Sequence, residues 1–411
     1  MRRGIKAGAM TLGLALALTA CAGSSTDTSD TPSESASAAA PTDTLVIWTD
    51  ETRQAAVEQA SAAYEESNPD IDIEIVLKNF DDIRADFLAQ VPTGEGPDIT
   101  VGAHDWLGEL TTNGVVLPIE LGDFAEKFEE VAVQAFTQDG QVYGLPYAIE
   151  NIALIRNTAL AAEAPATWDA AVEAGRAAGT TYPILIQTGD KGDPYTYYPL
   201  QTSFGAPVFV QNEDGSYAAE LALGGEPGHA FAGWLQQQGA AGVLSPDMTY
   251  DIAVEAFKNG ESPFIIGGPW MLEQFAGLEL AIDPVPSAGG EAAQPFVGVQ
   301  GFYISARTEN SLIANDFLVN YMGTEDVQLA LYEAGNRPPA LKTAAEKAAS
   351  DPVTAGFAAV GADAVPMPSI PEMGAVWNFW GVTEPNIITG AGDPVTGWDK
   401  MVADIQGAMG S

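Results

Sequence analysis

Short apolar runs alternate with segments of helical spacing near the start of the chain, and this order restricts the fold to few architectures. Residues 44–48 predict a strand, residues 55–68 a helix, and residues 70–75 a second strand in which isoleucine alternates with acidic residues. Apolar residues spaced by three and four predict a second helix over residues 80–91. A third strand and helix follow in residues 94–114. This order predicts an α/β domain with a largely parallel sheet.

The segment of residues 94–114 places an acidic and an aromatic side chain where a ligand is expected. Its strand runs into Asp105 and Trp106 at the start of the helix. In open α/β sheets, ligands bind outside the carboxyl ends of the strands. A carboxylate can accept hydrogen bonds from neighbouring hydroxyl groups while an indole ring covers an apolar sugar face. The segment therefore predicts a carbohydrate cleft with Asp105 and Trp106 at its mouth.

Similar residue types follow two other predicted strands. Asp50 and Glu51 come after the first strand, and Trp270 follows a later strand in the sequence GGPW. Between them, a segment with glycine and proline at residues 143–150 predicts an extended crossing into a second α/β region. Residues 296–306 predict an extended return crossing. Two such crossings suit a hinge between two lobes.

The first twenty residues have the features of a signal peptide that is removed from the mature protein. Three basic residues precede an apolar run over residues 10–18, which is too short to span a bilayer. The sequence Leu-Thr-Ala-Cys that ends at Cys21 resembles a bacterial lipobox, so we expect Cys21 to be lipidated and to become the mature N-terminus. The alternative is an ordinary signal peptide with an incidental cysteine.

Residues 21–43 comprise this cysteine and a segment rich in serine, threonine, alanine and aspartate. It carries too few large apolar side chains to fold, so it predicts a flexible tether with a root-mean-square reach of about 25 Å. We therefore expect a lipid-anchored protein at the extracellular face of the bacterial cytoplasmic membrane. Its globular part begins at residue 44.

The remaining length, about 370 residues, is enough for two domains. The formal net charge of the whole chain, −40, argues against nucleic acid or an anionic membrane surface as a partner. Cys21 is the only cysteine, which excludes an intramolecular disulfide and a cysteine-based zinc site. The two histidines, His104 and His229, are too few for a metal cluster, and we expect them to be structural. We expect no metal and no cofactor.

Eight segments in a fixed order resemble one known family. They are TLVIW (44–48), TGEGPDITVGAHD (93–105), GLPYAIENIALIRN (144–157), DPYTYYPL (193–200), EAFKNGE (255–261), GGPW (267–270), PFVGV (295–299) and MPSIPEM (367–373). Together they resemble the maltose/maltodextrin-binding proteins of ABC importers, within the larger family of extracellular solute-binding proteins. The similarity covers nearly the whole chain after the tether.

The resemblance implies a two-lobed α/β fold, periplasmic-binding-protein-like, with hinge crossings and a ligand cleft between the lobes. One lobe is expected to comprise residues 44–149 and 301–347, and the other residues 150–300 and 348–411. The resemblance also implies a monomer and no catalysis. Closure of the lobes is expected to enclose an oligosaccharide of the maltose/maltodextrin type, which is then delivered to ABC permease subunits in the membrane.

The resemblance further implies ligand contacts in both lobes. It matches carboxylates of the first lobe and of the crossing, aromatic rings of the second lobe, and an aromatic residue of the C-terminal segment. Asp193 stands where the maltose-binding proteins have a glutamate, and Arg53 where they have a lysine. With the residues at the strand ends, the expected ligand-binding set is Asp50, Glu51, Arg53, Asp105, Trp106, Glu150, Asp193, Tyr195, Trp270, Met367 and Trp377.

Three positions depart from the family pattern. Gly102 replaces a tryptophan that serves as a platform, and Trp106 and Gly381 replace arginines. The last two changes remove guanidinium groups that could donate paired hydrogen bonds to hydroxyl groups. The identity, linkage and chain length of the sugar therefore stay open. So does the question whether Trp106 takes the place of the missing platform.

Other interpretations also remain open. Trp270 and Trp377 could pack in the core, as we expect for other tryptophans of the chain. Glu150 with Asp105 or Asp193 could act as the acid and base of a glycoside hydrolase. The chain could also be a receptor for a different oligosaccharide, or a surface adhesin that holds polysaccharide without transport. The tryptophans expected to pack are Trp48, Trp168, Trp234 and Trp398.

Overall fold

The computed structural model of the protein describes residues 43–212, 216–362 and 364–410. The predicted signal peptide, the lipidation of Cys21 and nearly all of the tether lie outside the described residues, so they stay predictions. Within the described ranges, no helix is both long enough and apolar enough to cross a membrane.

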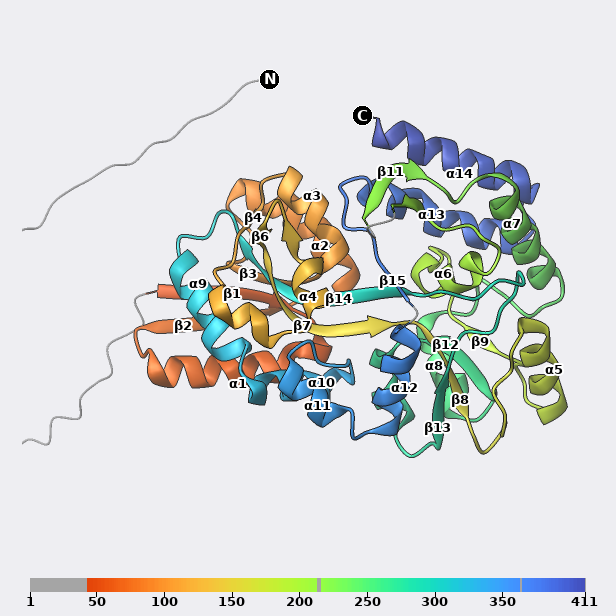
Figure 1. Ribbon diagram of the computed structural model, residues 1–411, viewed down its shortest axis with the longest axis horizontal. Helices are drawn as coiled ribbons and strands as arrows, with labels where there is room; N and C mark the ends of the chain where they lie inside the picture. Colours follow the sequence, from red (N-terminus) through yellow and green to blue (C-terminus); the bar gives the residue numbers. More distant parts are fainter. Residues whose placement is uncertain (1–42, 213–215, 363, 411) are drawn as a thin grey trace, which may run out of the picture. The chain divides into compact units, whose positions relative to one another are not determined.

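The larger sheet of the described residues contains seven strands and begins with the predicted β-α-β-α-β order (Figure 1). Its first elements are β1 (Asp43–Thr49), α1 (Glu51–Ser67), β2 (Ile71–Leu77), α2 (Phe80–Gln90), β3 (Ile99–Ala103), α3 (Leu107–Thr112) and β4 (Val116–Leu117). β1 pairs in parallel with both β2 and β3, so the carboxyl ends of the three strands meet at one edge of the sheet. The predicted order of these elements is confirmed.

The side chains that begin the helices also fix where polar groups lie. Asp50 accepts a hydrogen bond from the backbone N–H of Thr52 at 2.8 Å, and Asn79 accepts one from Asp81 at 3.0 Å. These side chains cap α1 and α2, so both helices begin directly after their strands. After β3, a 3-10 turn at His104–Trp106 leads into α3. Polar side chains from three connections therefore gather at the same edge of the sheet.

Two long strands connect the larger sheet with the second part of the chain. They are β7 (Gly144–Asn151) and β14 (Phe296–Ser305), which pair antiparallel and appear in Figure 1 as long neighbouring arrows. The extended crossings predicted at residues 143–150 and 296–306 are thus confirmed as strands, while movement about them stays a prediction. β14 is also antiparallel to β3, because it returns from the second part of the chain. The sheet is therefore mixed rather than largely parallel.

A second sheet lies in the other part of the described chain. Its strand order is β13 (Leu280–Asp283), β8 (Ala153–Asn157), β12 (Phe264–Gly267) and β9 (Leu185–Ile186), and β8 is antiparallel to both neighbours. The protein thus has the two-lobed α/β fold that the resemblance implied, with a separate sheet and its own helices in each lobe. The helices of the second part are α5 (Trp168–Ala178), α6 (Pro194–Thr202), α7 (Gly225–Ala240), α8 (Tyr250–Lys258), α12 (Pro352–Gly361), α13 (Met373–Ile388) and α14 (Pro394–Met409).

The remaining elements are short. β5 (Thr137–Gln138) and β6 (Gln141–Val142) form a hairpin whose turn residues, Asp139 and Gly140, have positive φ angles of 52° and 78°. The others are α4 (Glu130–Ala135), β10 (Phe209–Gln211), β11 (Tyr217–Leu221), α9 (Ser311–Phe317), α10 (Glu325–Gly335), α11 (Lys342–Ala348) and β15 (Val365–Pro366), with short 3-10 turns at Val91–Thr93, Gly122–Lys127 and Pro269–Phe275 and a π-helical turn at Leu318–Met322.

Buried apolar side chains of the described residues form three clusters. The largest draws its members from residues 45–148 and 297–344 and packs against the larger sheet. A second cluster draws on residues 152–296 and 367–405, and the third packs around β8 and β12. The largest cluster takes in Val297 and Val299, which the sequence places in the second lobe, and the boundaries of the lobes stay a prediction. The tryptophans expected to pack, Trp48, Trp168, Trp234 and Trp398, are all buried.

Candidate functional site

A cavity of about 980 Å³ is lined by residues from both parts of the chain. The turns after β1, β2 and β3 line one side, the start of α6 and the Pro269–Phe275 turn line another, and β7 and β14 contribute residues between them. Its volume lies at the upper end of the roughly 300–1,000 Å³ that is typical of small-molecule sites. The structure brings the whole predicted ligand-binding set together in this cavity, while contact with a ligand stays a prediction. Lining it are Asp50, Glu51, Arg53, Asp105, Trp106, Glu150, Asp193, Tyr195, Trp270, Met367 and Trp377.

Aromatic side chains from the second part of the chain form one wall of the cavity. The rings of Trp270 and Tyr195 have centroids 6.2 Å apart and planes tilted by 38°. Trp377 stacks on Trp380, with centroids 5.5 Å apart. Trp380 is fully buried, and its indole N–H donates to Gln201 at 3.1 Å, so it supports Trp377 from the core. Trp270, Tyr195 and Trp377 stay partly exposed, which leaves ring surface available to a ligand.

Asp105 links the turn after β3 to this aromatic wall. Its carboxylate accepts a hydrogen bond from the indole N–H of Trp377 at 2.9 Å. Burial raises the pKa of this carboxyl group to about 6, although the charge of Arg84 and the bond from Trp377 act in the opposite direction. Since a carboxylate has several lone pairs, Asp105 can hold Trp377 and still accept a hydrogen bond from a ligand hydroxyl.

His104 fixes the position of the turn that carries Asp105. Its Nδ1 accepts a hydrogen bond from the backbone N–H of Val299 at 3.0 Å, so the ring proton lies on Nε2, which donates to the backbone carbonyl of Met367 at 3.0 Å. Burial lowers the pKa of His104 to about 4, which keeps the ring neutral. His104 is therefore structural, as expected, and it joins the turn, β14 and the segment that holds Met367.

Asp50 and Arg53 form a buried ion pair at the start of α1. Arg53 also donates from Nε to the hydroxyl group of Tyr147, and its guanidinium lies over the ring of Phe80 at 4.8 Å from the centroid. Burial opposes ionisation of Asp50, but the ion pair with Arg53 and the hydrogen bonds from Thr52 outweigh it and lower the pKa of the carboxyl group. Asp50 and Arg53 therefore build the cavity wall first of all, whereas Glu51 is exposed at its rim.

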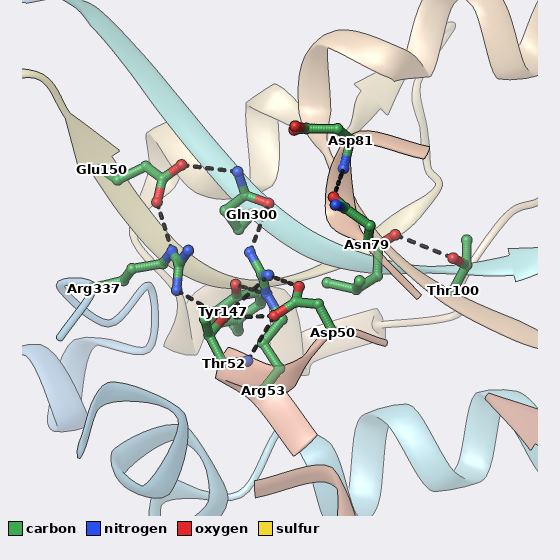
Figure 2. A network of polar contacts seen from close by, with 11 residues as sticks. Asp50, Thr52, Arg53, Asn79, Asp81, Thr100, Tyr147, Glu150, Gln300 and Arg337 are labelled. Carbon is green, nitrogen blue, oxygen red and sulfur yellow. Dashed lines mark hydrogen bonds and ion pairs between the residues drawn. The ribbon is translucent and has the colours of Figure 1, made fainter. Parts of the chain in front are cut away.

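A chain of polar contacts continues from Arg53 across both crossing strands (Figure 2). Arg53 donates from Nη2 to Oε1 of Gln300 at 3.3 Å, and Nε2 of Gln300 donates to Oε1 of Glu150 at 2.8 Å. Oε2 of Glu150 accepts from Nε of Arg337, also at 2.8 Å. Both carboxylate oxygens of Glu150 thus already have protein partners. The contacts tie β7 and β14 to α1 and to the segment that follows α10.

Asp193 caps α6 on the second side of the cavity. Its carboxylate accepts hydrogen bonds from the backbone N–H of Thr196 at 3.2 Å and from the side chain of Gln187. Its own backbone N–H donates to the buried carboxyl group of Glu384 at 3.2 Å. Burial raises the pKa of Asp193, while the bonds from Thr196 and Gln187 lower it by less. The start of α6 is therefore fixed on both sides, which positions Tyr195 in the cavity.

Trp106 occupies the space over Gly102. A Cβ atom at Gly102 would lie 2.7 Å from ring atoms of Trp106 and 2.9 Å from the ring of Tyr303. Trp106 also packs against Phe80, with centroids 5.2 Å apart and planes tilted by 33°. Trp106 is only 8% exposed, whereas Phe80 is partly exposed and also lines the cavity. The indole thus fills the place of a side chain at position 102 and supports Phe80.

Gly381 lies where no side chain fits. A Cβ atom there would lie 2.7 Å from the carbonyl oxygen of Lys191, and one at Gly192 would collide with the carbonyl oxygen of Gly381. Gly192 also has a φ angle of 71°, which favours glycine. The backbone of α13 therefore packs directly on the loop before α6. An arginine at position 381 would push these segments apart.

The interpretation of the sequence missed several residues that line the cavity. Gln300 could have been found, because it is a polar residue in the middle of the mostly apolar strand FVGVQGFYIS. Arg337 follows α10, far along the chain from the strand ends, and only the folded chain brings it to Glu150. Among the described residues, no group of histidine, cysteine and acidic side chains could hold a metal ion. The missed lining residues with polar or aromatic side chains are Thr52, Lys78, Asn79, Phe80, Asp81, Arg84, Gln187, Lys191, Thr196, Tyr250, Gln300 and Arg337.

A family model described as "Bacterial extracellular solute-binding protein" matches residues 59–359. The maltodextrin-binding protein MdxE of Bacillus subtilis (strain 168) is 29% identical over 81% of this chain and 82% of its own length. The galactooligosaccharide-binding protein of the same strain is 26% identical over 89% of both chains. A solved structure, the Thermus thermophilus maltotriose binding protein bound with maltotriose, aligns with a TM-score of 0.80 and 30% identity. This alignment covers 89% of this chain and all of that one.

Proposed function

The chain belongs to the bacterial extracellular solute-binding protein family, and we propose that it is the receptor of an ABC importer for oligosaccharides of the maltodextrin type. The observation that carries this proposal is the lining of the cavity, where the partly exposed rings of Trp270, Tyr195 and Trp377 lie beside carboxylates such as Asp105. Aromatic rings cover the apolar faces of pyranoses, and carboxylates accept hydrogen bonds from their hydroxyl groups. The names of several relatives support the same class of ligand.

Ring stacking and charge-assisted hydrogen bonds supply the affinity in this proposal. A hydrogen bond from a sugar hydroxyl to a charged group contributes about 1.5–3 kcal/mol net. The aromatic wall belongs to the second part of the chain and Asp105 to the first, so a ligand gains both kinds of contact only when the two sides approach. Sugar then selects the closed state, because it binds that state better than an open one.

A thermal-shift screen against a panel of oligosaccharides tests this proposal. A ligand present at about 100 times its Kd adds about 2.7 kcal/mol to the free energy of unfolding, which raises the melting temperature. Maltose, maltotriose and longer maltodextrins are expected to raise it, whereas an unrelated disaccharide of equal concentration serves as the control. The absence of a shift with every maltodextrin would contradict the proposed ligand class.

A receptor for a different oligosaccharide is the second candidate function. One observation favours it: one of the relatives is named for galactooligosaccharides. The family resemblance adds that Trp106 and Gly381 stand where the maltose-binding proteins have arginines. The same thermal-shift panel separates the two candidates if it includes galactooligosaccharides. A larger shift with these than with maltodextrins would favour the second candidate.

We propose that the protein binds its sugar without cleaving it. Both carboxylate oxygens of Glu150 accept hydrogen bonds from Gln300 and Arg337, and Asp105 is engaged with Trp377. Carboxyl groups held in this way are better suited to position a ligand than to exchange protons with it, as the acid and base of a glycoside hydrolase must do. Incubation of the purified protein with maltodextrin is the test, and new reducing ends would indicate an enzyme.

Anchoring, location and partners complete the proposal. The lipobox-like sequence that ends at Cys21 and the residues up to 43 support a lipid anchor at the extracellular face of the bacterial cytoplasmic membrane. The family resemblance supports a monomer. We propose that ABC permease subunits recognise its closed form and take over the oligosaccharide. The proposed lobes that close on the sugar comprise residues 44–149 with 301–347 and residues 150–300 with 348–411.

A further inference from the structure

A short restrained segment carries Arg337 into the cavity. Asn336 ends α10 with a left-handed backbone, at φ 53°. The carbonyl of Pro338 then accepts a hydrogen bond from the N–H of Ile149 at 2.9 Å, and the N–H of Ala340 donates to a carbonyl of β7, also at 2.9 Å. Two consecutive prolines further limit the backbone of this segment. The position of Arg337 beside β7 is therefore set by the fold and not by a freely moving loop.

The guanidinium of Arg337 has donors without a partner among the described residues. A guanidinium carries five N–H groups. Nε donates to Glu150 at 2.8 Å and Nη1 donates to Thr52 at 3.3 Å, as Figure 2 shows. No other described residue accepts a hydrogen bond from Arg337, so three N–H groups remain. Arg337 is only 8% exposed and it lines the cavity, so the cavity is where these donors can find acceptors.

An aromatic ring from the other side of the cavity lies close to these donors. Cζ of Arg337 lies over the Trp270 ring, 5.8 Å from its centroid, so the guanidinium covers part of one face of the indole. A pyranose that packs against the ring surface left open would present hydroxyl groups at its edge beside the guanidinium. The planar fork of an arginine matches two neighbouring oxygen atoms, which a lysine cannot do.

The charges around Arg337 favour a neutral ligand. Its own charge is paired with Glu150, and the charges of the cavity lining nearly balance, with six acidic and five basic residues, so no surplus of positive charge is left for an anion. The chain as a whole carries a formal net charge of −40. An acidic sugar would have to approach against this field, whereas the hydroxyl groups of a neutral sugar would not.

We propose that Arg337 is a ligand-binding residue that donates paired hydrogen bonds to neighbouring hydroxyl groups of a neutral pyranose packed on Trp270. The proposal rests on the proposed function as an oligosaccharide receptor, and it names the donor and the kind of sugar edge that the site selects. Arg337 also supplies a guanidinium group to the cavity, whereas positions 106 and 381 carry tryptophan and glycine.

Calorimetric titration with maltotriose tests the role of Arg337. Arg337→Lys keeps a positive charge beside Glu150 but removes the fork, and it is expected to weaken binding by about 10-fold or more. Arg307→Lys is the matched control, because Arg307 is exposed and outside this cavity, and it is expected to bind like the wild type. Urea unfolding without sugar shows whether each variant folds. Arg337→Gln is the second variant if Arg337→Lys lowers the urea midpoint.

Maltotriose derivatives that each lack one hydroxyl group distinguish a direct hydrogen bond between Arg337 and the sugar from an indirect effect of the substitution through Glu150. If Arg337 donates to a hydroxyl group of the sugar, removal of that group is expected to lower the affinity of the wild type about 10-fold. The affinity of Arg337→Lys is expected to fall by much less. Equal losses in both proteins for every derivative would overturn the proposal, as would wild-type affinity in Arg337→Lys. Tighter binding of a uronate-containing oligosaccharide than of maltotriose would overturn the proposal that the ligand is a neutral sugar. Failure of the wild type to bind any oligosaccharide would overturn the proposed function as well.

Discussion

At the scale of single residues, three buried carboxyl groups of the cavity already have partners within the protein. Asp50 pairs with Arg53, Glu150 with Arg337, and Asp105 accepts a hydrogen bond from Trp377. These contacts hold the groups in place before a ligand arrives, so less conformational freedom is lost on binding. In the proposed receptor, the carboxylates therefore act as rigid acceptors and not as flexible side chains that search for hydroxyl groups.

Asp105 gives this view a test that depends on pH. Its pKa is about 6 in the folded protein against an ordinary 3.8, so the folded state holds its proton at higher pH than the unfolded state. Asp105 therefore lowers the stability as the pH rises from 4 to 7, by about 2–3 kcal/mol. Asn does not titrate, so the stability of Asp105→Asn lacks this fall. The free energy of unfolding of the variant minus that of the wild type is therefore expected to rise by this amount from pH 4 to pH 7. Urea unfolding of both proteins at pH 4 and pH 7 measures the difference, and an unchanged difference would contradict the raised pKa.

Single residues of the site could be predicted where they follow strand ends or match the family pattern. Asp105, Trp270 and Trp377 were found in this way. Arg337 could not be found, because its place depends on how the segment after α10 pairs with β7. Trp106 lines the cavity as predicted, but its packing over Gly102 and against Phe80 could not be predicted, and its contact with a ligand stays a prediction.

At the scale of elements, β3 and the turn after it depend on one small residue. Trp106 reaches back over Gly102 and supports Phe80 at the start of α2. This packing joins two connections of the sheet edge into one wall of the cavity. The glycine at position 102 and the tryptophan at position 106 therefore form one packing unit, and a change at one position affects the other.

Gly102→Ala tests this dependence. The added methyl group would lie 2.7 Å from the ring of Trp106 and 2.9 Å from that of Tyr303, so overpacking is expected to cost about 1–3 kcal/mol. The cost is expected to fall when Trp106→Ala is present, because one of the two rings is then absent. Urea unfolding of the two single variants and the double variant measures the coupling. Additive effects would show that Trp106 does not lie over Gly102.

The order of elements was predictable because hydrophobic spacing and helix caps are local signals. The alternation of strands and helices before residue 114 and the two extended crossings are examples. The direction of β14 in the larger sheet was not predictable from such signals, since it depends on the return from the second part of the chain. Local patterns likewise gave no hint that Gly192 and Gly381 bring α13 onto the loop before α6.

At the scale of the whole molecule, function in this proposal depends on the crossings β7 and β14. Ligand is expected to close the lobes about residues 144–152 and 296–303. Small-angle scattering with and without saturating maltotriose measures this, and the radius of gyration is expected to fall. An unchanged radius, in a sample where calorimetry confirms binding, would contradict closure.

The proposed membrane attachment depends on Cys21, which lies outside the described part of the chain. If Cys21 carries the lipid anchor, Cys21→Ser is expected to release the protein from the membrane fraction without changing its sugar affinity. Fractionation after a high-salt wash, followed by titration of the released protein, measures both properties. Retention of the variant on the washed membranes would contradict lipid anchoring through Cys21.

The central claim is that this cavity binds an oligosaccharide on its aromatic wall, and titration calorimetry with maltotriose tests it most directly. The wild type is expected to bind saturably, with one sugar per protein. Trp270→Ala and Trp377→Ala each remove ring contact and exclusion of water, so each is expected to lose more than about 2 kcal/mol of binding free energy. Wild-type affinity in both variants, or no binding by the wild type, would contradict the claim.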